Sequence, residues 1–157
     1  METTSKPKIL TLCLTLKDNK ILLGMKKRGF GEGRWNGFGG KVEEGETIIE
    51  AAIREMREES GLMVEKIEET GITTFQFLDT GKILEVHIFN VLKYSGEMIE
   101  TEEMKPQWFN LNEIPFGSMW PDDIYWMPLF LKGNKFKGDF VFENNDKLLS
   151  HKIEIIW

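Results

Sequence analysis

The sequence predicts an α/β (α+β) fold in which helices pack against a mixed β-sheet. Three observations predict it. The 157 residues match the commonest size of a single domain. One strongly amphipathic helix stands among runs of strand-forming residues, and Gly, Asp and Asn separate those runs. With no internal repeat or linker, residues 1–157 are expected to fold as one sandwich of helices and sheet.

The amino-terminal part predicts two strands and a long loop. Residues 9–16 and 21–25 read as strands joined by a polar turn at 17–20. Residues 26–45 contain seven of the 15 glycines and show no periodicity. They predict an ordered loop with short strand pieces.

The helix that follows this loop has clear sequence signals at both ends. Thr47 and Glu50 have the spacing of a capping box, and Gly61 supplies the left-handed residue that ends a helix. Apolar residues recur between them at helical spacing. The buried stripe is expected to consist of Ile49, Ala52, Ile53 and Met56.

The carboxyl-terminal part predicts mostly strands. Four strands are expected at residues 64–72, 73–77, 84–92 and 107–111. A second helix is expected at 124–131, broken or started by Pro128. A final hairpin is expected from residues 136–142 and 148–156, turning at 144–146.

Composition limits the partners and the compartment. A net charge of -6 argues against a stable nucleic-acid partner, because such binding depends on many Lys and Arg side chains. No apolar run is long enough to span a membrane, and the amino terminus has no hydrophobic signal region. The single cysteine, Cys13, rules out an internal disulfide framework and fits a reducing compartment. A soluble, intracellular monomer is therefore expected.

Three carboxylates share one face of the predicted helix. Glu55, Glu58 and Glu59 stand at i, i+3 and i+4, where like charges repel one another. A hard divalent cation with oxygen ligands would compensate for that repulsion. The alternative is a solvated, charged helix face.

These residues belong to a longer pattern. Gly40, Glu46, Arg54-Glu55-Met56, Glu58-Glu59 and Gly61-Leu62 follow the spacing G-x5-E-x7-R-E-U-x-E-E-x-G-U, where U is apolar. In this pattern, residues 40–62 resemble the Nudix box. The resemblance implies an α-β-α sandwich and hydrolysis of a phosphoanhydride attached to a nucleoside. It also implies dependence on Mg²⁺, with Mn²⁺ as a substitute.

The resemblance assigns roles around the box. Glu55, Glu58, Glu59 and the carbonyl of Gly39 are implied as metal ligands, and Glu103 as a further metal ligand or base. The alternative for Glu103 is a solvated acidic loop at 99–103. Gly37, Gly39 and Gly40 allow the backbone to adopt positive φ and to come close to a ligand.

Two basic residues and one acid have secondary roles. Arg54 either fixes the rotamer of a neighbouring catalytic glutamate or makes an ordinary i,i+4 pair with Glu50 or Glu58. Glu46 is expected to support the junction of loop and helix. Lys26 either touches the triphosphate or belongs to a solvated turn.

Substrate choice is implied by a closer resemblance within the family. Residues 24–47, 109–131 and 135–142 are similar to Nudix enzymes that hydrolyse oxidised purine deoxynucleoside triphosphates. The expected substrates are 8-oxo-dGTP, 2-hydroxy-dATP, 8-oxo-dATP and methylated purine nucleotides, cut to the monophosphate and pyrophosphate. An apolar slot for the purine would be formed by Phe75, Phe77, Trp120 and Trp126; the alternative for each aromatic is a core position.

Polar side chains near this slot are expected to read the base. Asp122 and Asp123 beside Trp120 suit hydrogen bonds to a base edge, and Asn36 offers both a donor and an acceptor. Burial and mutual repulsion are expected to leave one of the two aspartates protonated near neutral pH. The resemblance adds Thr11 and Phe30 to the substrate site.

Two other functions compete with this hypothesis. The same chemistry on a dinucleotide, ADP-ribose or capped RNA would need recognition elements that the sequence lacks. A catalytically silent Nudix domain would bind nucleotides or a protein, but it would not need the full glutamate set. The resemblance implies a cytoplasmic enzyme, with nucleus and mitochondrial matrix as further compartments.

Overall fold

The computed structural model describes residues 6–156. Within that range eight strands form one mixed sheet. They are β1 (Lys8–Lys17), β2 (Lys20–Lys26), β3 (Trp35–Asn36), β4 (Met63–Phe77), β5 (Ile83–Ser95), β6 (Met104–Asn110), β7 (Phe136–Asn144) and β8 (Lys147–Ile155). The helices are α1 (Ile48–Ser60) and α2 (Asp123–Leu131), with short 3-10 turns at Leu111–Glu113 and Phe116–Ser118.

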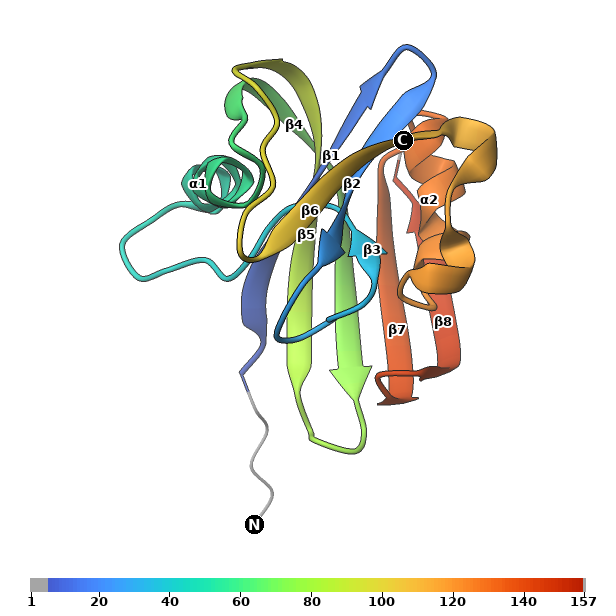
Figure 1. Cartoon of the computed structure of the whole chain (residues 1–157). Helices are drawn as coiled ribbons and strands as arrows, with labels where there is room; N and C mark the ends of the chain where they lie inside the picture. The colour runs from blue at the N-terminus through green and yellow to red at the C-terminus, as the bar shows by residue number, and fades with distance from the viewer. Residues whose placement is uncertain (1–5, 157) are drawn as a thin grey trace.

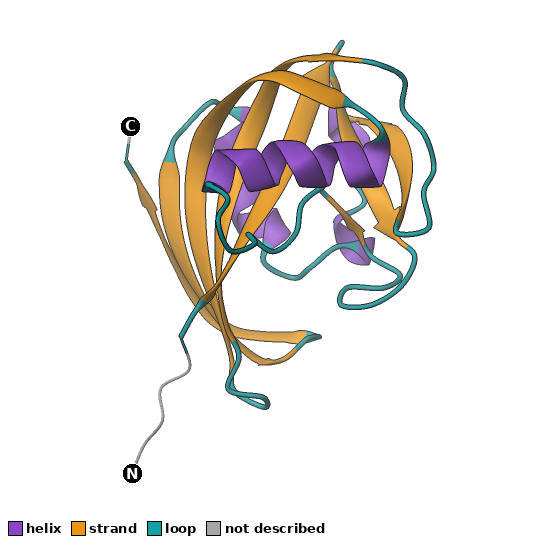
Figure 2. Ribbon diagram, turned by 90° about the vertical axis from the view of Figure 1, so that its left-hand side faces the viewer, coloured by secondary structure: helices purple, strands orange, loops and turns teal. Residues whose placement is uncertain are grey.

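The sheet lies between the two helices. Its strand order is β3-β2-β1-β5-β4-β7-β8, and β6 also pairs with β2. β1 runs parallel to β5, and β4 runs parallel to β7. Figure 1 shows α1 and α2 on opposite sides of the sheet, and in Figure 2 α1 crosses in front of the strands. The predicted α+β class is confirmed.

The strands divide the apolar residues between two cores. Leu14 of β1 packs with Trp126 and Phe130 of α2. The preceding residue, Cys13, packs with Ala52 of α1 on the other side. Successive side chains of a strand point to opposite faces, so β1 contributes to both cores.

β1 and β2 separate soon after their shared turn. Asp18 and Asn19 at the turn have φ values of 51° and 64°, as a tight hairpin turn requires. Pairing extends only from Lys17 and Lys20 to Thr15 and Leu22. Beyond that point, the segment after β3 takes the place of β2 beside β1.

That segment is hydrogen-bonded along β1. Phe38 N–H donates to the Cys13 carbonyl at 3.0 Å, and Cys13 N–H donates back to the Phe38 carbonyl. Thr11 N–H donates to the Gly40 carbonyl at 2.9 Å. The glycine-rich loop is therefore fixed to the sheet as an irregular strand, which agrees with the predicted loop containing short strand pieces.

Helix α1 has the predicted ends but a different buried stripe. Thr47 and Glu50 form the complete capping box, and Gly61 ends the helix at φ 82°. Ile49, however, is 50% exposed, so its assignment to the stripe is wrong. Ile48 packs against the core instead, because it stands four residues before Ala52 and shares its side of the helix.

Two further predictions need correction. β4 is continuous where a break was expected between residues 72 and 73. Gly71 marks no turn there: it leaves space for the ring of Phe136, which a Cβ at that position would approach to 2.6 Å. In α2, Pro128 neither starts nor ends the helix, which continues through it to Leu131.

Candidate active site

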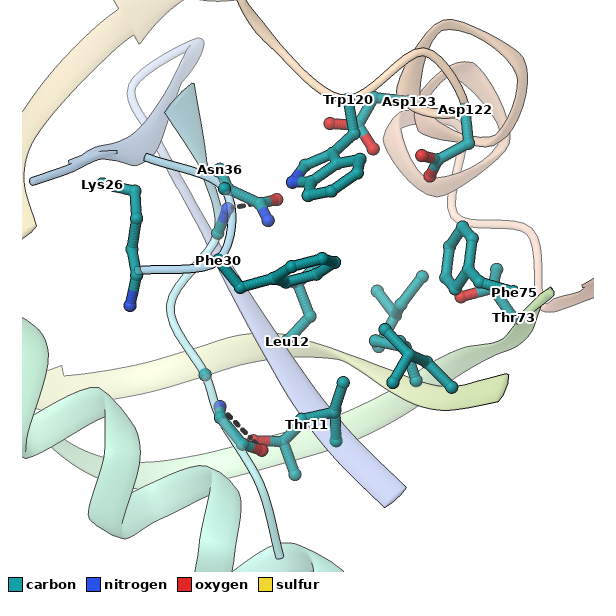
Figure 3. Close-up of a pocket in the computed structure, with 18 of the residues that line it drawn as sticks. Thr11, Leu12, Lys26, Phe30, Asn36, Thr73, Phe75, Trp120, Asp122 and Asp123 are labelled. Atoms are coloured by element: carbon teal, nitrogen blue, oxygen red, sulfur yellow. Dashed lines mark hydrogen bonds between the residues drawn. The ribbon is translucent and has the colours of Figure 1, made fainter. Parts of the chain in front are cut away.

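A cavity of about 270 Å³ extends over the sheet from α1 to α2. β1, β4 and β5 supply its floor, and the loop after β2 and the start of α2 supply its walls (Figure 3). All ten residues that the sequence analysis assigned to the substrate site line this cavity: Thr11, Lys26, Phe30, Asn36, Phe75, Phe77, Trp120, Asp122, Asp123 and Trp126. Gly39 and Glu59 line it as well, whereas Glu55, Glu58 and Glu103 stand outside its lining.

The glycine-rich loop lies directly against two of the predicted metal ligands. Gly39 N–H donates to Glu59 Oε1 at 2.9 Å. A Cβ on Gly40 would lie 2.6 Å from the carboxyl carbon of Glu55. The loop backbone therefore packs directly against both carboxylates and leaves no room for a side chain at Gly40.

The three glycines do not use the positive φ that glycine allows. Gly37, Gly39 and Gly40 are outside the left-handed region, which other glycines of the loop occupy. Glycine is needed at Gly37 and Gly39 because there is no space for a side chain. A Cβ on Gly39 would lie 1.8 Å from the Thr11 carbonyl oxygen, and a Cβ on Gly37 would lie 2.7 Å from the Cys13 carbonyl oxygen. The close approach of the loop to β1 requires glycine at these positions.

Gly39→Ala is expected to destabilise the protein by about 3 kcal/mol or more, because the new methyl group must displace the backbone of β1. Hydrolytic activity should fall with it. Thermal unfolding measures the stability change. Gly117→Ala is the matched control, since no atom lies within 4 Å of its Cβ position. Equal melting temperatures for the two variants would contradict the prediction.

Burial makes ionisation of the helix carboxylates unfavourable. Glu59 is 5% exposed, and this burial raises its pKa to about 7 although Gly39 N–H and Lys26 favour the anion. Burial also raises the pKa of Glu55, opposed by its hydrogen bond from Arg54. A cation beside these groups would stabilise their charged forms.

Arg54 contacts three glutamates at once. Its guanidinium lies 2.6 Å from Glu46 Oε1, 2.8 Å from Glu55 Oε1 and 3.2 Å from Glu58 Oε2. It therefore orients Glu55 and also makes the i,i+4 pair with Glu58, whereas Glu50 caps the helix. The hydrogen bonds from Arg54 lower the pKa of Glu46 to about 2, so Glu46 is an anion at the junction of loop and helix.

Glu103 is paired with two basic side chains. Lys26 Nζ donates to its Oε2 at 3.2 Å, and Arg28 Nε donates to its Oε1 at 2.9 Å. The hydrogen bonds from Arg28 and Lys26 lower the pKa of Glu103. Lys26 Nζ also lies 3.8 Å from Glu59 Oε2, so Lys26 belongs to the site and not to a solvated turn.

The donor set fits a hard divalent cation. Its side-chain donors are all carboxylate oxygens, which Mg²⁺ prefers, and the family resemblance adds the carbonyl oxygen of Gly39 to them. Within residues 6–156 no three acidic, His or Cys side chains are already gathered around one point. Arg54 hydrogen-bonds to Glu58, and Arg28 hydrogen-bonds to Glu103.

The far end of the cavity carries the two buried aspartates. Asp122 and Asp123 are 3% and 2% exposed, and Trp126 Nε1 donates to Asp122 Oδ2 at 2.7 Å. Burial raises the pKa of Asp122. Burial and the nearby Asp122 charge raise the pKa of Asp123 further. Ionisation of both aspartates together is therefore unfavourable, and the anion of Asp123 is disfavoured more strongly than that of Asp122.

The aromatic residues combine core and surface roles. Trp126 stacks on Phe136 and is 1% exposed, so it is a core residue whose edge reaches the cavity. Trp120 lies 4.9 Å from the Phe30 ring, between centroids, and carries the Arg34 guanidinium over its own ring at 4.2 Å. Phe30 is 44% exposed and is the aromatic best placed to adjust to a ligand.

Several lining residues were missed in the sequence. They are mainly floor residues: Leu10, Leu12, Thr73, Leu84, Val86 and Ile88. Strand alternation gives the signal that would have found them, since Thr73 stands two residues before Phe75 and so faces the same side. Thr73 is fully buried, and its hydroxyl has no hydrogen-bond partner within residues 6–156.

Comparison with known proteins agrees with this geometry. The family model of the NUDIX domain matches residues 6–130, so the chain belongs to the Nudix family of hydrolases. It is 51% identical to the oxidized purine nucleoside triphosphate hydrolase of Mus musculus over 149 residues, covering 95% of this chain and 96% of that protein. The protein of the same description from Danio rerio is 50% identical, covering 94% of each.

The fold has a matching relative among solved structures. The crystal structure of a MutT protein from Bacillus halodurans aligns with a TM-score of 0.84 at 29% identity, covering 94% of this chain and 97% of that one. The expected Nudix fold is thereby confirmed. Among residues 6–156, neither helix is long and apolar enough to cross a membrane.

Proposed function

We propose that this protein hydrolyses oxidised purine nucleoside triphosphates to the monophosphate and pyrophosphate in a Mg²⁺-dependent reaction. The observation that carries the proposal is the single cavity joining Asp122 and Asp123 at one end to Glu59 at the other. The names of the mouse and zebrafish relatives support this substrate class. The role in the cell would be to keep damaged purines out of DNA synthesis.

The reaction would take place at the Glu59 end. Mg²⁺ held by Glu55, Glu58, Glu59, Glu103 and the Gly39 carbonyl would neutralise phosphate charge and lower the pKa of an attacking water. Metal binding would lower the pKa of Glu59 from its metal-free value of about 7, so that Glu59 would serve as an anionic ligand.

The base would be recognised at the α2 end. Asp122 offers an acceptor, protonated Asp123 offers a donor, and Asn36 adds an amide. The 8-oxo group of guanine changes the adjacent ring nitrogen from acceptor to donor, and a donor and acceptor side by side can match such altered edges. The same pair would serve oxidised adenine with the proton moved between the two acids.

The decisive experiment is a substrate panel. The purified protein is incubated with Mg²⁺ and normal, oxidised or methylated purine triphosphates, together with ADP-ribose and a dinucleotide. Products are identified by chromatography. We expect 8-oxo-dGTP and 2-hydroxy-dATP to be converted to monophosphate and pyrophosphate much faster than dGTP and dATP. Faster hydrolysis of ADP-ribose than of the oxidised purines would identify ADP-ribose as the substrate instead. Absence of any turnover would favour a binding module.

A further inference from the structure

Two charged segments far apart in sequence meet at the mouth of the catalytic end. One is the basic turn of Lys26, Lys27 and Arg28, and the other is the acidic loop before β6. Lys27 Nζ lies 2.7 Å from Glu100 Oε2, and Arg28 lies 2.7 Å from Glu103 Oε1. The Lys27 N–H also donates to the Glu103 carbonyl at 2.9 Å.

Lys26 differs from its neighbours in this network. Its side chain is 23% exposed, against 37% for Lys27 and 59% for Arg28. It lines the cavity, and its ammonium contacts Glu103 at 3.2 Å and Glu59 at 3.8 Å. Figure 3 shows the side chain directed toward α1 and away from the two aspartates. Lys26 therefore bridges Glu59 of α1 and Glu103 of the loop before β6.

We infer that Lys26 is an internal competitor of the metal, released to the nucleotide phosphates when a divalent ion takes Glu59 and Glu103. The inference rests on the proposed function, which makes these two glutamates metal ligands. Its own basis is the position of the ammonium group, within 4 Å of both carboxylates.

Electrostatic repulsion requires that the divalent ion replace the Lys26 ammonium group at the two carboxylates. A divalent ion that binds both carboxylates would lie close to the ammonium group, and like charges at such distances repel strongly where water is partly excluded. Lys26 must then leave, and a triphosphate in the cavity offers it a new anionic partner. Metal and nucleotide therefore each favour binding of the other, since both displace the same ion pairs.

The test measures metal affinity in the absence of nucleotide. Mn²⁺ is titrated into the protein and free ion is followed by electron paramagnetic resonance. We expect Lys26→Met to bind Mn²⁺ about 3- to 10-fold more tightly than wild type, because the competing charge is removed. Lys26→Arg, which keeps the charge, should stay near wild type. Lys27→Met is the matched control, since its partner Glu100 is not a proposed ligand.

A second measurement tests the contact between Lys26 and the nucleotide phosphates in the absence of metal. With metal chelated, binding of a non-hydrolysable dGTP analogue should be weaker for Lys26→Met than for Lys27→Met, because a phosphate contact is lost. Unchanged or weaker Mn²⁺ binding by Lys26→Met, with an unchanged melting temperature, would overturn the inference. If that variant does not fold, Lys26→Gln takes its place. Neither measurement involves turnover, so the proposed function is tested separately by wild-type hydrolysis of 8-oxo-dGTP.

Discussion

Glu59→Gln is expected to reduce hydrolysis on the order of 10³-fold or more while making the metal-free protein more stable. Activity is lost because the neutral amide cannot hold a divalent ion as firmly as the carboxylate. Stability increases because Glu59 is buried, and a neutral amide avoids the unfavourable burial of a carboxylate. A variant that keeps activity within tenfold of wild type would remove Glu59 from the mechanism.

The stability change should depend on pH in a defined direction. The folded-state pKa of Glu59 is raised to about 7 from 4.5. Wild-type stability should therefore fall as pH rises through this window, because the folded protein holds the proton more tightly than the unfolded chain. Above pH 7 the full difference, about 1 to 3 kcal/mol, separates wild type from Glu59→Gln. Urea unfolding at pH 5 and pH 8 in EDTA measures it, with exposed Glu65→Gln as control.

The aspartate pair should control selectivity rather than chemistry. Asp123→Asn is expected to lower the ratio of kcat/KM for 8-oxo-dGTP over dGTP by about 10²-fold, because it fixes the pair in one hydrogen-bonding pattern and unpaired polar groups then face the base. Asp122→Asn should act similarly and can still accept the hydrogen bond of Trp126. Mn²⁺ affinity should be unchanged in both, since neither is near Glu59.

Exposed Asp139→Asn on β7 is the control for this pair of variants. Steady-state rates on 8-oxo-dGTP, 2-hydroxy-dATP and dGTP give kcat/KM for each substrate, and the selectivity is read from the pairwise ratios of these values. Discrimination between 8-oxo-dGTP and dGTP that is unchanged in both aspartate variants would show that base reading lies elsewhere, for example at Asn36.

Local interactions explain what the sequence predicted well. The ends of α1 depend on Thr47, Glu50 and Gly61, which lie within one helix and its caps, so short-range spacing suffices to find them. Motif spacing likewise identified the glutamates. Features that depend on distant contacts were missed: Gly71 makes room for Phe136, and Lys26 pairs with Glu103 across 77 positions.

More of the predicted site residues line the cavity than short-range sequence signals alone could have identified. Trp120, Asp122 and Phe75 came from a family resemblance, whereas alternation along the strands could have added Thr73 and its neighbours on the cavity floor. The raised pKa values of the aspartates needed the structure, because they depend on the burial of both side chains and on the charge of the neighbouring acid.

The sheet with a separate apolar core on each face has a consequence for how such an enzyme diverges. Most of the glutamates proposed as metal ligands come from α1, which packs on one core, whereas the two aspartates proposed to contact the base stand at the start of α2, which packs on the other. Under the proposed function, substitutions at the start of α2 would change the preferred nucleotide without disturbing the glutamates. A lineage can acquire new substrates at one end of the molecule while inheriting its reaction intact at the other.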